Sequence, residues 1–489
     1  MTPAKPLAEV LLGGVAWMMA MRWGVRLIGL LSTVILARLL MPADFGVVAM
    51  AMVCVGLVNQ LLDFGLEFGL IRNPNAERKH YDTTWTIRLL QMGGVSIVLA
   101  AAAPFIASGY DEPRVMPILW VIAFGAFVRA WENIGTIDFR KHLLFDRDFK
   151  FNVYIKLGGF LVTIGLAFYL RNYWALVVGS LFNHCVAVGL SYVMSSYRPR
   201  FSLEAVGEVF SFSQWMLVRG FANYIFGRGD EIITGKIFGS IGLGYYAMAK
   251  NVSSMATAEI VQPASRAFVP GFSQFENEPS RLASAFTRAI SGMALVVVPA
   301  GLGLSCVAPE VVPILLGHKW LGTIPLLQLV PIAEVVMALH GLAGSLVIVI
   351  GRVKLLAAVA WLRALVMLGC VYLGFQFAGL IGVVYGMIAS ATFSFIVLNS
   401  AAISVSELEW GRIIRAVVRP VVAGACMMGA IYWVGALFAF PLLVLLIVKM
   451  IVGATVYLSV IGLLWRAFGG TEAIETELLN MVRQKLKLG

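Results

Sequence analysis

The chain has 489 residues, of which 60% are hydrophobic and 13% are charged, and its mean hydropathy is +0.88. Soluble globular domains are close to half apolar and a quarter charged, so this composition excludes that class and favours one membrane-embedded body. The net charge of +11 comes from scattered basic residues without a long basic run or a base-stacking module, so nucleic-acid binding is not expected.

Long apolar stretches follow one another through the whole sequence. Each is long enough to cross a bilayer as a helix, and each is too uniformly apolar for the alternating strands of a β-barrel. The expected fold is an all-α membrane protein with about 14 transmembrane helices. We place them at residues 13–38, 45–70, 83–108, 115–138, 152–170, 173–194, 209–237, 244–265, 284–307, 324–349, 354–376, 379–404, 415–436 and 441–466.

The first stretch is longer than the apolar region of a signal peptide and carries two arginines, so we interpret it as a retained span. The five cysteines lie in apolar stretches without metal-ligand spacing and are interpreted as packing residues. The sequence has no phosphate-binding glycine loop with lysine, no nucleophile elbow and no metal-ligand cluster. We therefore expect neither an enzyme nor a cofactor or metal site.

Basic residues alternate between the connections of these spans. One set of connections, together with the two ends of the chain, holds about 21 Lys and Arg residues, and the other set holds about 4. Lys and Arg gather on the cytoplasmic side of bacterial membrane proteins. The pattern predicts an even number of spans with both termini in the cytoplasm, and a cytoplasmic tail at residues 471–489.

The sequence repeats itself at an offset of about 198 residues. The stretch 46–51 reads GVVAMA and the stretch 244–249 reads GYYAMA, while Trp17-Met18 matches Trp215-Met216 at the same offset. Six predicted spans separate the copies, so both enter the membrane in the same direction. This predicts parallel repeats with a transport site between them. The expected organisation is one lobe at 1–200, a second at 201–408, and two additional helices at 409–470.

Several basic residues lie inside the predicted spans, where a charge is costly and marks a transport pathway by default. Arg22 and Arg26 lie four residues apart and project from one face of the first span, and Arg219 lies in its repeat counterpart. Guanidinium groups match phosphate oxygens in bidentate geometry, so a phosphate or pyrophosphate group is the predicted ligand. Further candidate ligands for this anion are Arg129, Lys250 and Arg288. Local pairing with a carboxylate is the alternative, above all for Arg129, which has Glu132 three residues on.

Acidic residues in the spans are candidates for ion coupling. Gln60, Asp63 and Glu67 form a polar stripe on the second span, and Asp230 follows Arg228 in the seventh. Such carboxylates bind a proton or a sodium ion in coupled transporters. They equally serve as counter-ions for the arginines, and the sequence leaves both roles open.

Residues 35–46, ILARLLMPADFG, followed by Asp63-Phe64-Gly65-Leu66, resemble the opening of the Wzx-type polysaccharide transporters. Further matches are DEIITGK at 230–236, LLGHKW at 315–320 and Gly351-Arg352. These transporters are oligosaccharide flippases of the multidrug/oligosaccharidyl-lipid/polysaccharide superfamily, which also holds multidrug extruders and the lipid II flippase.

The resemblance implies two six-helix lobes with two extra helices, alternating access and a cationic cavity. The implied cargo is a polyprenyl-pyrophosphate-linked oligosaccharide crossing a bacterial inner membrane. The implied partners are this lipid-linked sugar, the lipid bilayer and, in addition, a polysaccharide polymerase and glycosyltransferases. Two alternatives stay open, a cation-coupled multidrug extruder of the same superfamily and a membrane scaffold that does not transport.

Overall fold

The computed structural model describes residues 7–62, 70, 76–142, 144–206, 214–275, 278–438 and 440–468. Side chains are described in these ranges except at 7–20, 22, 61, 62, 214–219, 258–260, 262–267, 269, 270, 353 and 468. The regular structure in the described ranges is entirely helical. The chain forms two compact units: unit 1 is Met1–Tyr224 with Gly235–Gly244, and unit 2 is Ile225–Thr234 with Tyr245–Gly489.

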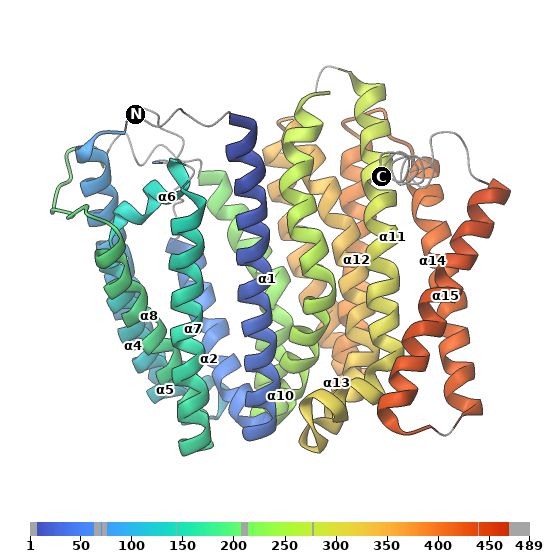
Figure 1. The fold of residues 1–489 in the computed structure, drawn as a ribbon, viewed down its shortest axis with the longest axis horizontal. Coiled ribbons are helices and arrows are strands. Elements are labelled where there is room, and N and C mark those ends of the chain that lie inside the picture. Colours follow the sequence, from blue (N-terminus) through green and yellow to red (C-terminus); the bar gives the residue numbers. More distant parts are fainter. Residues whose placement is uncertain are drawn as a thin grey trace. The chain divides into compact units, whose positions relative to one another are not determined.

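Unit 1 is built from antiparallel helix pairs. Helix α4 packs on α5, α7 packs on α8 and α1 packs on α7 (Figure 1). After α5 the chain bends by 69° into the short helices η1 and α6. The helices are α1 (Leu7–Leu39), α2 (Pro42–Leu62), α4 (Arg78–Tyr110), α5 (Val115–Ala130), η1 (Ile134–Thr136), α6 (Ile137–Lys141), α7 (Phe145–Leu170) and α8 (Trp174–Met194).

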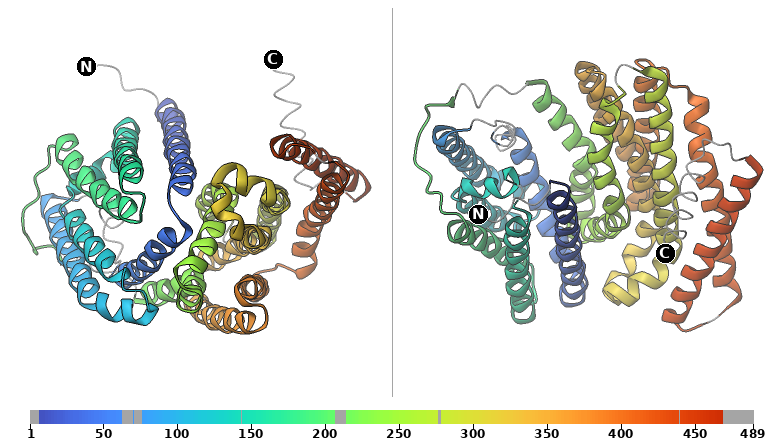
Figure 2. Two further views of the ribbon diagram at one scale, coloured as in Figure 1. Left: turned by 90° about the horizontal axis from the view of Figure 1, so that it is seen from below. Right: turned by 45° about the horizontal axis from the view of Figure 1, so that its top comes forward.

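Unit 2 has α11, α12 and α13 at its centre, packed through a continuous apolar core. Helices α14 and α15 pair with each other and lie at the edge of the unit, against α11 (Figure 2). The helices are α10 (Gln214–Ser273, shared with unit 1), α11 (Pro279–Val311), η2 (Val312–Leu316), η3 (His318–Thr323), α12 (Ile324–Val349), α13 (Val353–Ile403), α14 (Trp410–Leu437) and α15 (Leu442–Phe468).

Two of these helices each contain two spans. Helix α10 is broken at Gly239 and α13 at Ala378 and Gly379, where both glycines have positive φ values that an L side chain rarely adopts. In α13 a side chain at Gly374 or Gly382 would collide with the other's backbone, so the two halves fold back on each other in close contact. Counted this way, each of the fourteen predicted spans coincides with a helical segment of the described chain.

The composition of the helices fits a bilayer. Among the described residues, nine helices are long and apolar enough to cross a membrane, or ten if the bent α5–α6 pair is one span. Large apolar side chains cover the outer surface: Trp120, Phe124 and Phe127 project from one face of α5 and are 47%, 56% and 40% exposed. Such a face is stable in lipid and would be an aggregation site in water. The prediction of an all-helical membrane fold is confirmed.

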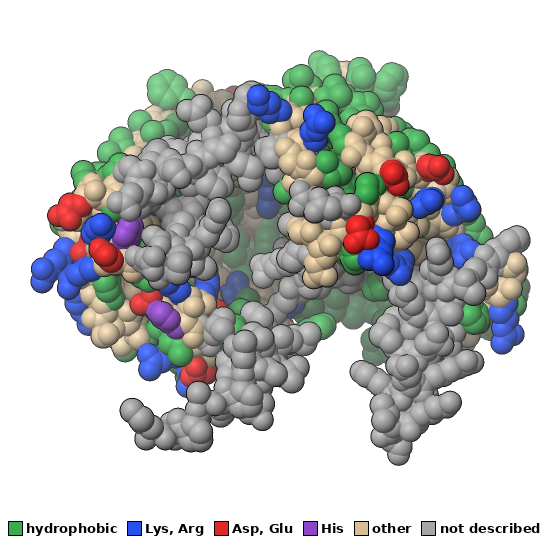
Figure 3. Space-filling model, turned by 90° about the horizontal axis from the view of Figure 1, so that it is seen from above, with side chains coloured by type: hydrophobic (Ala, Val, Ile, Leu, Met, Phe, Trp, Pro, Cys, Tyr) green, Lys and Arg blue, Asp and Glu red, His purple; other side chains and the backbone are tan. Residues whose placement is uncertain are grey.

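The connections alternate between the two ends of each unit. In unit 1 the α4–α5 and α7–α8 connections share one end, and the segment after α8 lies at the other (Figure 1). In unit 2 the α10–α11 and α12–α13 connections share one end, and η2 and η3 lie at the opposite end (Figure 1). Lys, Arg, Asp and Glu side chains gather on each unit at the end with the predicted inner connections (Figure 3). The two sets of connections therefore separate as predicted, while the cytoplasmic position of the termini stays a prediction.

The repeated motif meets its own copy inside unit 1. A side chain added at Gly46 would collide with the carbonyl of Ser240, and one added at Gly244 would collide with the carbonyl of Pro42. Pro42 and Ser240 are separated by the offset that separates Gly46 and Gly244. The contact is therefore reciprocal: a glycine of each copy packs against the backbone carbonyl of the other copy.

Candidate functional site

Unit 1 contains an open cavity of about 710 Å³ with walls from seven helices. Residues three or four apart project from the same face of a helix, which explains how Arg88, Gln91 and Met92 reach it together from α4. The remaining lining residues come from α2, α5 and the turn after it, α6, α7, α8 and the start of α10. They are Gly56, Asn59, Gln60, Arg129, Glu132, Arg140, Phe151, Asn152, Ile155, Asn183, His184, Ala187 and Tyr224.

The cavity is cationic, because three arginines line it against a single glutamate. Arg88 donates from Nη2 to the carbonyl oxygens of Glu132 (3.0 Å) and Arg129 (3.3 Å). The Glu132 carboxylate lies 3.9 Å from both Arg88 Nη2 and Arg129 Nε, so it is shared between two guanidinium groups. Arg140 lies 3.4 Å from Asp148, which also accepts from Asn152. The positive charge thus exceeds the negative charge on the cavity wall.

Five side-chain amides complete the polar part of the wall: Asn59, Gln60, Gln91, Asn152 and Asn183. An amide offers both a donor and an acceptor without charge, which suits the hydroxyl groups of a sugar. Asn183 Oδ1 is buried and has no hydrogen-bond partner in the described structure. An arginine-rich wall with neutral amides is equipped to hold an anion with polar, uncharged groups beside it.

Unit 2 contains a buried cluster of charges centred on α10. Lys250 Nζ lies 2.7 Å from Asp230 Oδ2 and 3.2 Å from Glu231 Oε1, and it donates to the carbonyl oxygen of Gly227 at 2.9 Å. Arg228 donates to Glu231 Oε1 at 2.7 Å, and the Tyr246 hydroxyl donates to Asp230 Oδ2. Asp230 and Glu231 are 2% and 3% exposed, so both carboxylates are compensated inside the unit rather than by water.

A second buried ion pair joins α11 to α15. Lys449 Nζ donates to Glu310 Oε1 at 2.6 Å, and the two side chains are 8% and 5% exposed. Helix α15 is strongly apolar apart from Lys449 and Arg466 in its last turn, so a buried lysine in its first third requires this partner. The pair fixes the α14–α15 edge to the centre of unit 2.

A family model described as "Polysaccharide biosynthesis protein" matches residues 35–325, which is more than half of the chain. The chain belongs to the polysaccharide biosynthesis protein family. Proteins of polysaccharide biosynthesis with comparable length are similar to the chain. The lipopolysaccharide biosynthesis protein WzxC of Escherichia coli K12 is 24% identical over 369 residues, covering 74% of each chain. The succinoglycan biosynthesis transport protein ExoT of Rhizobium meliloti is 23% identical over 342 residues, covering 68% of each chain.

Solved structures show which fold this family member has. The inward closed lipid II flippase MurJ superimposes with a TM-score of 0.72 at 12% identity, over 93% of this chain and 99% of that one. An inward-facing multidrug resistance MATE transporter superimposes with a TM-score of 0.62 at 16% identity, over 78% and 95%. At these identities the likeness concerns the fold alone. The family and the sequence relatives identify a multi-pass, Wzx-like polysaccharide biosynthesis transporter rather than an enzyme. Its fold is that of MurJ and the MATE transporters.

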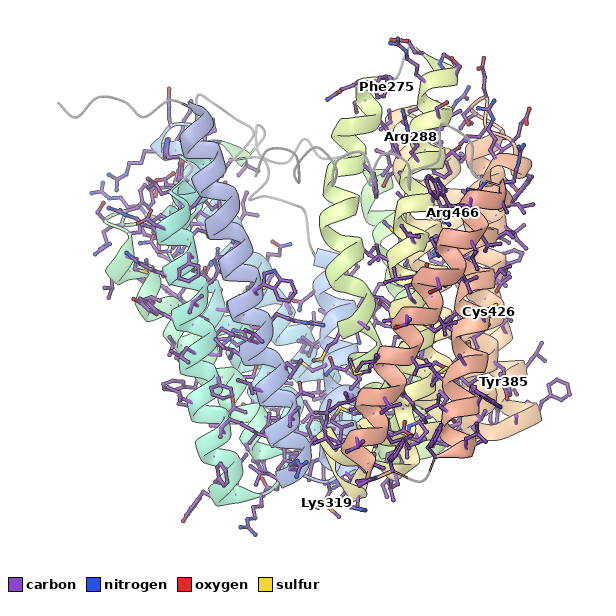
Figure 4. The ribbon with its side chains drawn as sticks, turned by 45° about the vertical axis from the view of Figure 1, so that its right-hand side comes forward. Phe275, Arg288, Lys319, Tyr385, Cys426 and Arg466 are labelled. Atoms are coloured by element: carbon purple, nitrogen blue, oxygen red, sulfur yellow. The ribbon has the colours of Figure 1, made fainter. Side chains whose placement is uncertain are left out.

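The predicted site residues of this family member lie in different parts of the two units. Arg129 lines the cavity of unit 1 and pairs with Glu132, as the alternative interpretation expected. Lys250 and Asp230 pair with each other in unit 2. Arg288 is exposed near the end of unit 2 that carries Phe275 and Arg466 (Figure 4). Arg26 lies half-buried on α1. The side chains of Arg22 and Arg219, together with Asp63 and Glu67, lie outside the described residues.

Sequence reasoning missed most of the cavity wall. Arg140 was assigned to a connection, because it lies just beyond the predicted span 115–138, but the bend after α5 leads into α6, which brings Arg140 to the cavity. The amides Asn152 and Asn183 carry no charge and were not among the predicted site residues. Their signal is weak but present, since each recurs at helical spacing from another lining residue, Ile155 and Ala187.

Proposed function

We propose that this transporter flips a polyprenyl-pyrophosphate-linked oligosaccharide repeat unit across the bacterial inner membrane by alternating access. The product would serve exopolysaccharide, capsule or O-antigen biosynthesis. The observation that supports the proposal most is the cavity of unit 1, where Arg88, Arg129 and Arg140 meet neutral amides. WzxC and ExoT are named for lipopolysaccharide and succinoglycan biosynthesis, two pathways that build polymers of sugars.

The chemistry of the cavity matches the two polar parts of such a cargo. Arginine forks form charge-assisted, bidentate hydrogen bonds with phosphate oxygens, and amides exchange hydrogen bonds with sugar hydroxyls. The pyrophosphate would lie against Arg88 and Arg140, and the first sugars would lie along Gln91, Asn152 and Asn183. A cationic wall repels the cationic drugs that a multidrug extruder exports, so it disfavours that alternative.

Other predicted residues keep their proposed roles. Arg22, Arg26 and Arg219 are candidates for contacting the same anionic headgroup at another stage of transport, with Lys250 and Arg288 as further candidates. Asp63, Glu67 and Asp230 are candidates for ion coupling. Glycosyltransferases would act on the cargo before it crosses the membrane, and a polymerase would act on it afterwards. Both termini of the transporter would lie in the cytoplasm.

The proposal is tested with the full-length protein in vesicles that contain a fluorescent polyprenyl-pyrophosphate oligosaccharide. Flipping is measured as the fraction of labelled lipid that a membrane-impermeant quencher reaches. We expect Arg88→Ala and Arg140→Ala each to slow flipping by about tenfold to a hundredfold, because each removes a charged hydrogen bond worth about 1.5–3 kcal/mol. Arg88→Lys keeps the positive charge but loses the bidentate guanidinium group. Its flipping rate should lie between those of wild type and Arg88→Ala.

Lys156→Ala is the matched control, because Lys156 is an exposed basic residue on α7, one position beyond the lining residue Ile155. It should flip lipid at the wild-type rate. Wild-type rates in folded Arg88→Ala and Arg140→Ala would contradict the headgroup assignment. Absence of flipping by the wild-type protein would contradict the proposed function and would favour a scaffold that does not transport.

A further inference from the structure

The strap, the non-helical segment at residues 195–205 after α8, is fastened to the first turns of α4 in unit 1. Asp82 Oδ1 accepts hydrogen bonds from the backbone N–H of Arg200 (2.8 Å) and from the Tyr197 hydroxyl (2.7 Å). The buried Asn133 donates from Nδ2 to the carbonyl oxygen of Tyr197 at 2.6 Å. Two further backbone N–H groups of the strap donate to threonine hydroxyls of α4: Ser202 to Thr86 (3.1 Å) and Ala205 to Thr83 (3.2 Å). The backbone of the strap therefore has a fixed path.

The strap lies where the charged part of α4 meets its apolar part. Residues 89–110 of α4 carry no charge and are about 33 Å long at 1.5 Å per residue, close to the hydrocarbon thickness of about 30 Å. The side chains of α4 that bind the strap lie just before this stretch, at positions 82–86. The strap therefore belongs to the headgroup layer, at the end of unit 1 with the predicted inner connections (Figure 1).

A row of aromatic rings joins the strap to the lipid-facing side of α5. The Phe201 ring lies 5.2 Å from the ring of the buried Trp85. The Trp85 ring lies 5.9 Å from that of Trp131, which in turn lies 6.3 Å from that of Phe127. Phe201 and Leu203 are 68% and 55% exposed. Since aromatic and apolar side chains at this level are stable against lipid, these two residues extend the lipid-facing surface of α5 onto the strap.

Basic side chains border this apolar surface. The Arg200 guanidinium group is exposed and forms no hydrogen bond or ion pair with any residue that the structure describes. Arg78 is 55% exposed and donates from Nη2 to the carbonyl oxygen of the exposed Arg198 at 3.2 Å, so it lies beside the strap. Three guanidinium groups thus face two carboxylates, Asp82 and Glu204, and Asp82 is buried. The surface is positive where it borders the apolar side chains.

We propose that the strap binds an anionic glycerophospholipid of the adjacent leaflet. The lipid phosphate accepts charge-assisted hydrogen bonds from Arg200 and Arg78, and the acyl chains lie against Phe201 and Leu203. A soluble anion would satisfy the guanidinium groups alone, and a zwitterionic lipid would bring its own cation to an already positive surface. No residue of the strap is among those that line the cavity, so the proposal does not depend on the proposed function.

The proposal is tested by photolabelling of the full-length protein in phosphatidylcholine vesicles. A trace of phosphatidylglycerol carries a diazirine on one acyl chain, and phosphatidylcholine with the same chain is the matched probe. Peptide mass spectrometry locates the adducts. We expect adducts within residues 195–205, with a yield severalfold higher for the phosphatidylglycerol probe.

Two variants separate the charged contact from the apolar one. Arg200→Gln should lower the phosphatidylglycerol yield to that of phosphatidylcholine and keep the wild-type melting temperature, because its guanidinium group holds no described residue in place. Leu203→Asn should lower the yields of both probes severalfold. Arg281→Gln is the matched control, because Arg281 is an exposed arginine in the first turn of α11 in unit 2. It should leave both yields at the strap unchanged.

Competition identifies the source of the phosphate. Excess phosphatidylglycerol should remove the strap adducts, whereas inorganic phosphate or a polyprenyl pyrophosphate at the same concentration should not. Displacement by inorganic phosphate would indicate a site for a free anion, and displacement by the polyprenyl pyrophosphate would assign the surface to the transported lipid. Either result would overturn the proposal, as would equal yields from the two probes, absence of adducts at the strap, or an undiminished preference for phosphatidylglycerol in Arg200→Gln. None of these readouts requires flipping, so a failure of the proposed function would leave them unchanged.

Discussion

Two side chains clamp the connection between α4 and α5 in unit 1. Arg114 donates from Nε and Nη2 to the two carboxylate oxygens of Glu112, at 2.8 and 2.7 Å. It also donates to Ser240 Oγ at 3.3 Å, next to the break in α10. The hydrogen bonds from Arg114 hold the pKa of Glu112 below its ordinary value. The clamp therefore stabilises the fold at pH values above the ordinary pKa of glutamate, and this stability is lost as the pH falls through the lowered pKa.

The clamp predicts a pH-dependent difference in thermal stability. Glu112→Gln should melt at a lower temperature than wild type at neutral pH, because the charge-assisted bonds are weakened. The difference should begin to shrink as the pH falls below about 4.3, the ordinary pKa of glutamate, and should be lost as the pH passes the lowered pKa of Glu112 in the folded protein. Melting of the detergent-solubilised protein over a pH series measures this. Glu204→Gln, at an exposed position, serves as the control. A difference that stays constant at every pH would show that the clamp is not ionic.

The buried Glu310–Lys449 ion pair predicts that removing one charge is more destabilising than removing both. Glu310→Gln should destabilise the protein by about 3–5 kcal/mol, because it leaves a lysine buried without its counter-ion. The double variant Glu310→Gln/Lys449→Met removes both charges and should recover most of that loss. Thermal unfolding of the two variants makes the comparison. Equal stability of the single and double variants would mean that Lys449 finds another partner.

At the scale of helices, small residues decide how closely α2 and α10 approach. Gly46 faces the carbonyl of Ser240, and Gly244 faces the carbonyl of Pro42. Close backbone approach is how membrane helices gain van der Waals contact without a hydrophobic effect between them. The same device joins the two halves of α13 through Gly374 and Gly382.

Substitution at this crossing should therefore be costly. Gly46→Ala forces a methyl group into the Ser240 carbonyl, so we expect a lower melting temperature and a lower yield of folded protein. Gly94→Ala is the matched control, since a side chain at this helical position in α4 would meet nothing within 4 Å. The control should be neutral or slightly stabilising, because alanine favours helix by about 1 kcal/mol over glycine. Equal behaviour of the two variants would contradict the close crossing.

At the scale of the whole molecule, the orientation in the membrane is open to a direct test. Lys319 in η3 lies at one end of unit 2, and Arg466 lies at the other (Figure 4). In a variant without the native cysteines, Lys319→Cys should react with an impermeant maleimide on intact spheroplasts. Arg466→Cys should react with this maleimide only after the spheroplasts have been permeabilised. The reverse labelling pattern would place both termini outside the cytoplasm.

The number and course of the helices were predictable from the sequence, because hydropathy along the chain is a local property. The two breaks in α10 and α13 were predictable too, since a glycine at 239 or 379 interrupts an apolar stretch that is too long for one span. The placement of the charged side chains was not. Glu310 and Lys449 are 139 residues apart, and no pattern within either helix identifies the other as its partner.

The cavity shows the same limit. Arg88, Arg140 and Asn183 come from three helices, and their meeting depends on how α4, α6 and α8 rotate against one another. A sequence pattern fixes which face of a helix is polar but not which neighbouring helix that face meets. The prediction that guanidinium groups hold an anion stays a prediction. Of the predicted ligands Arg129 lines the cavity, while Arg88 and Arg140, which also line it, were not among them.

The reciprocal crossing of Gly46 and Gly244 has an evolutionary consequence. In a half-length ancestor that paired with itself, this contact would have been isologous, and one mutation would have altered it twice. After fusion the two copies were free to diverge, but not equally at each position. A side chain at either glycine would collide with the other copy's backbone, so the contact requires glycine in both copies. Pro42 and Ser240 contribute main-chain oxygens, which any amino acid supplies, so the copies can differ at this position and keep the contact.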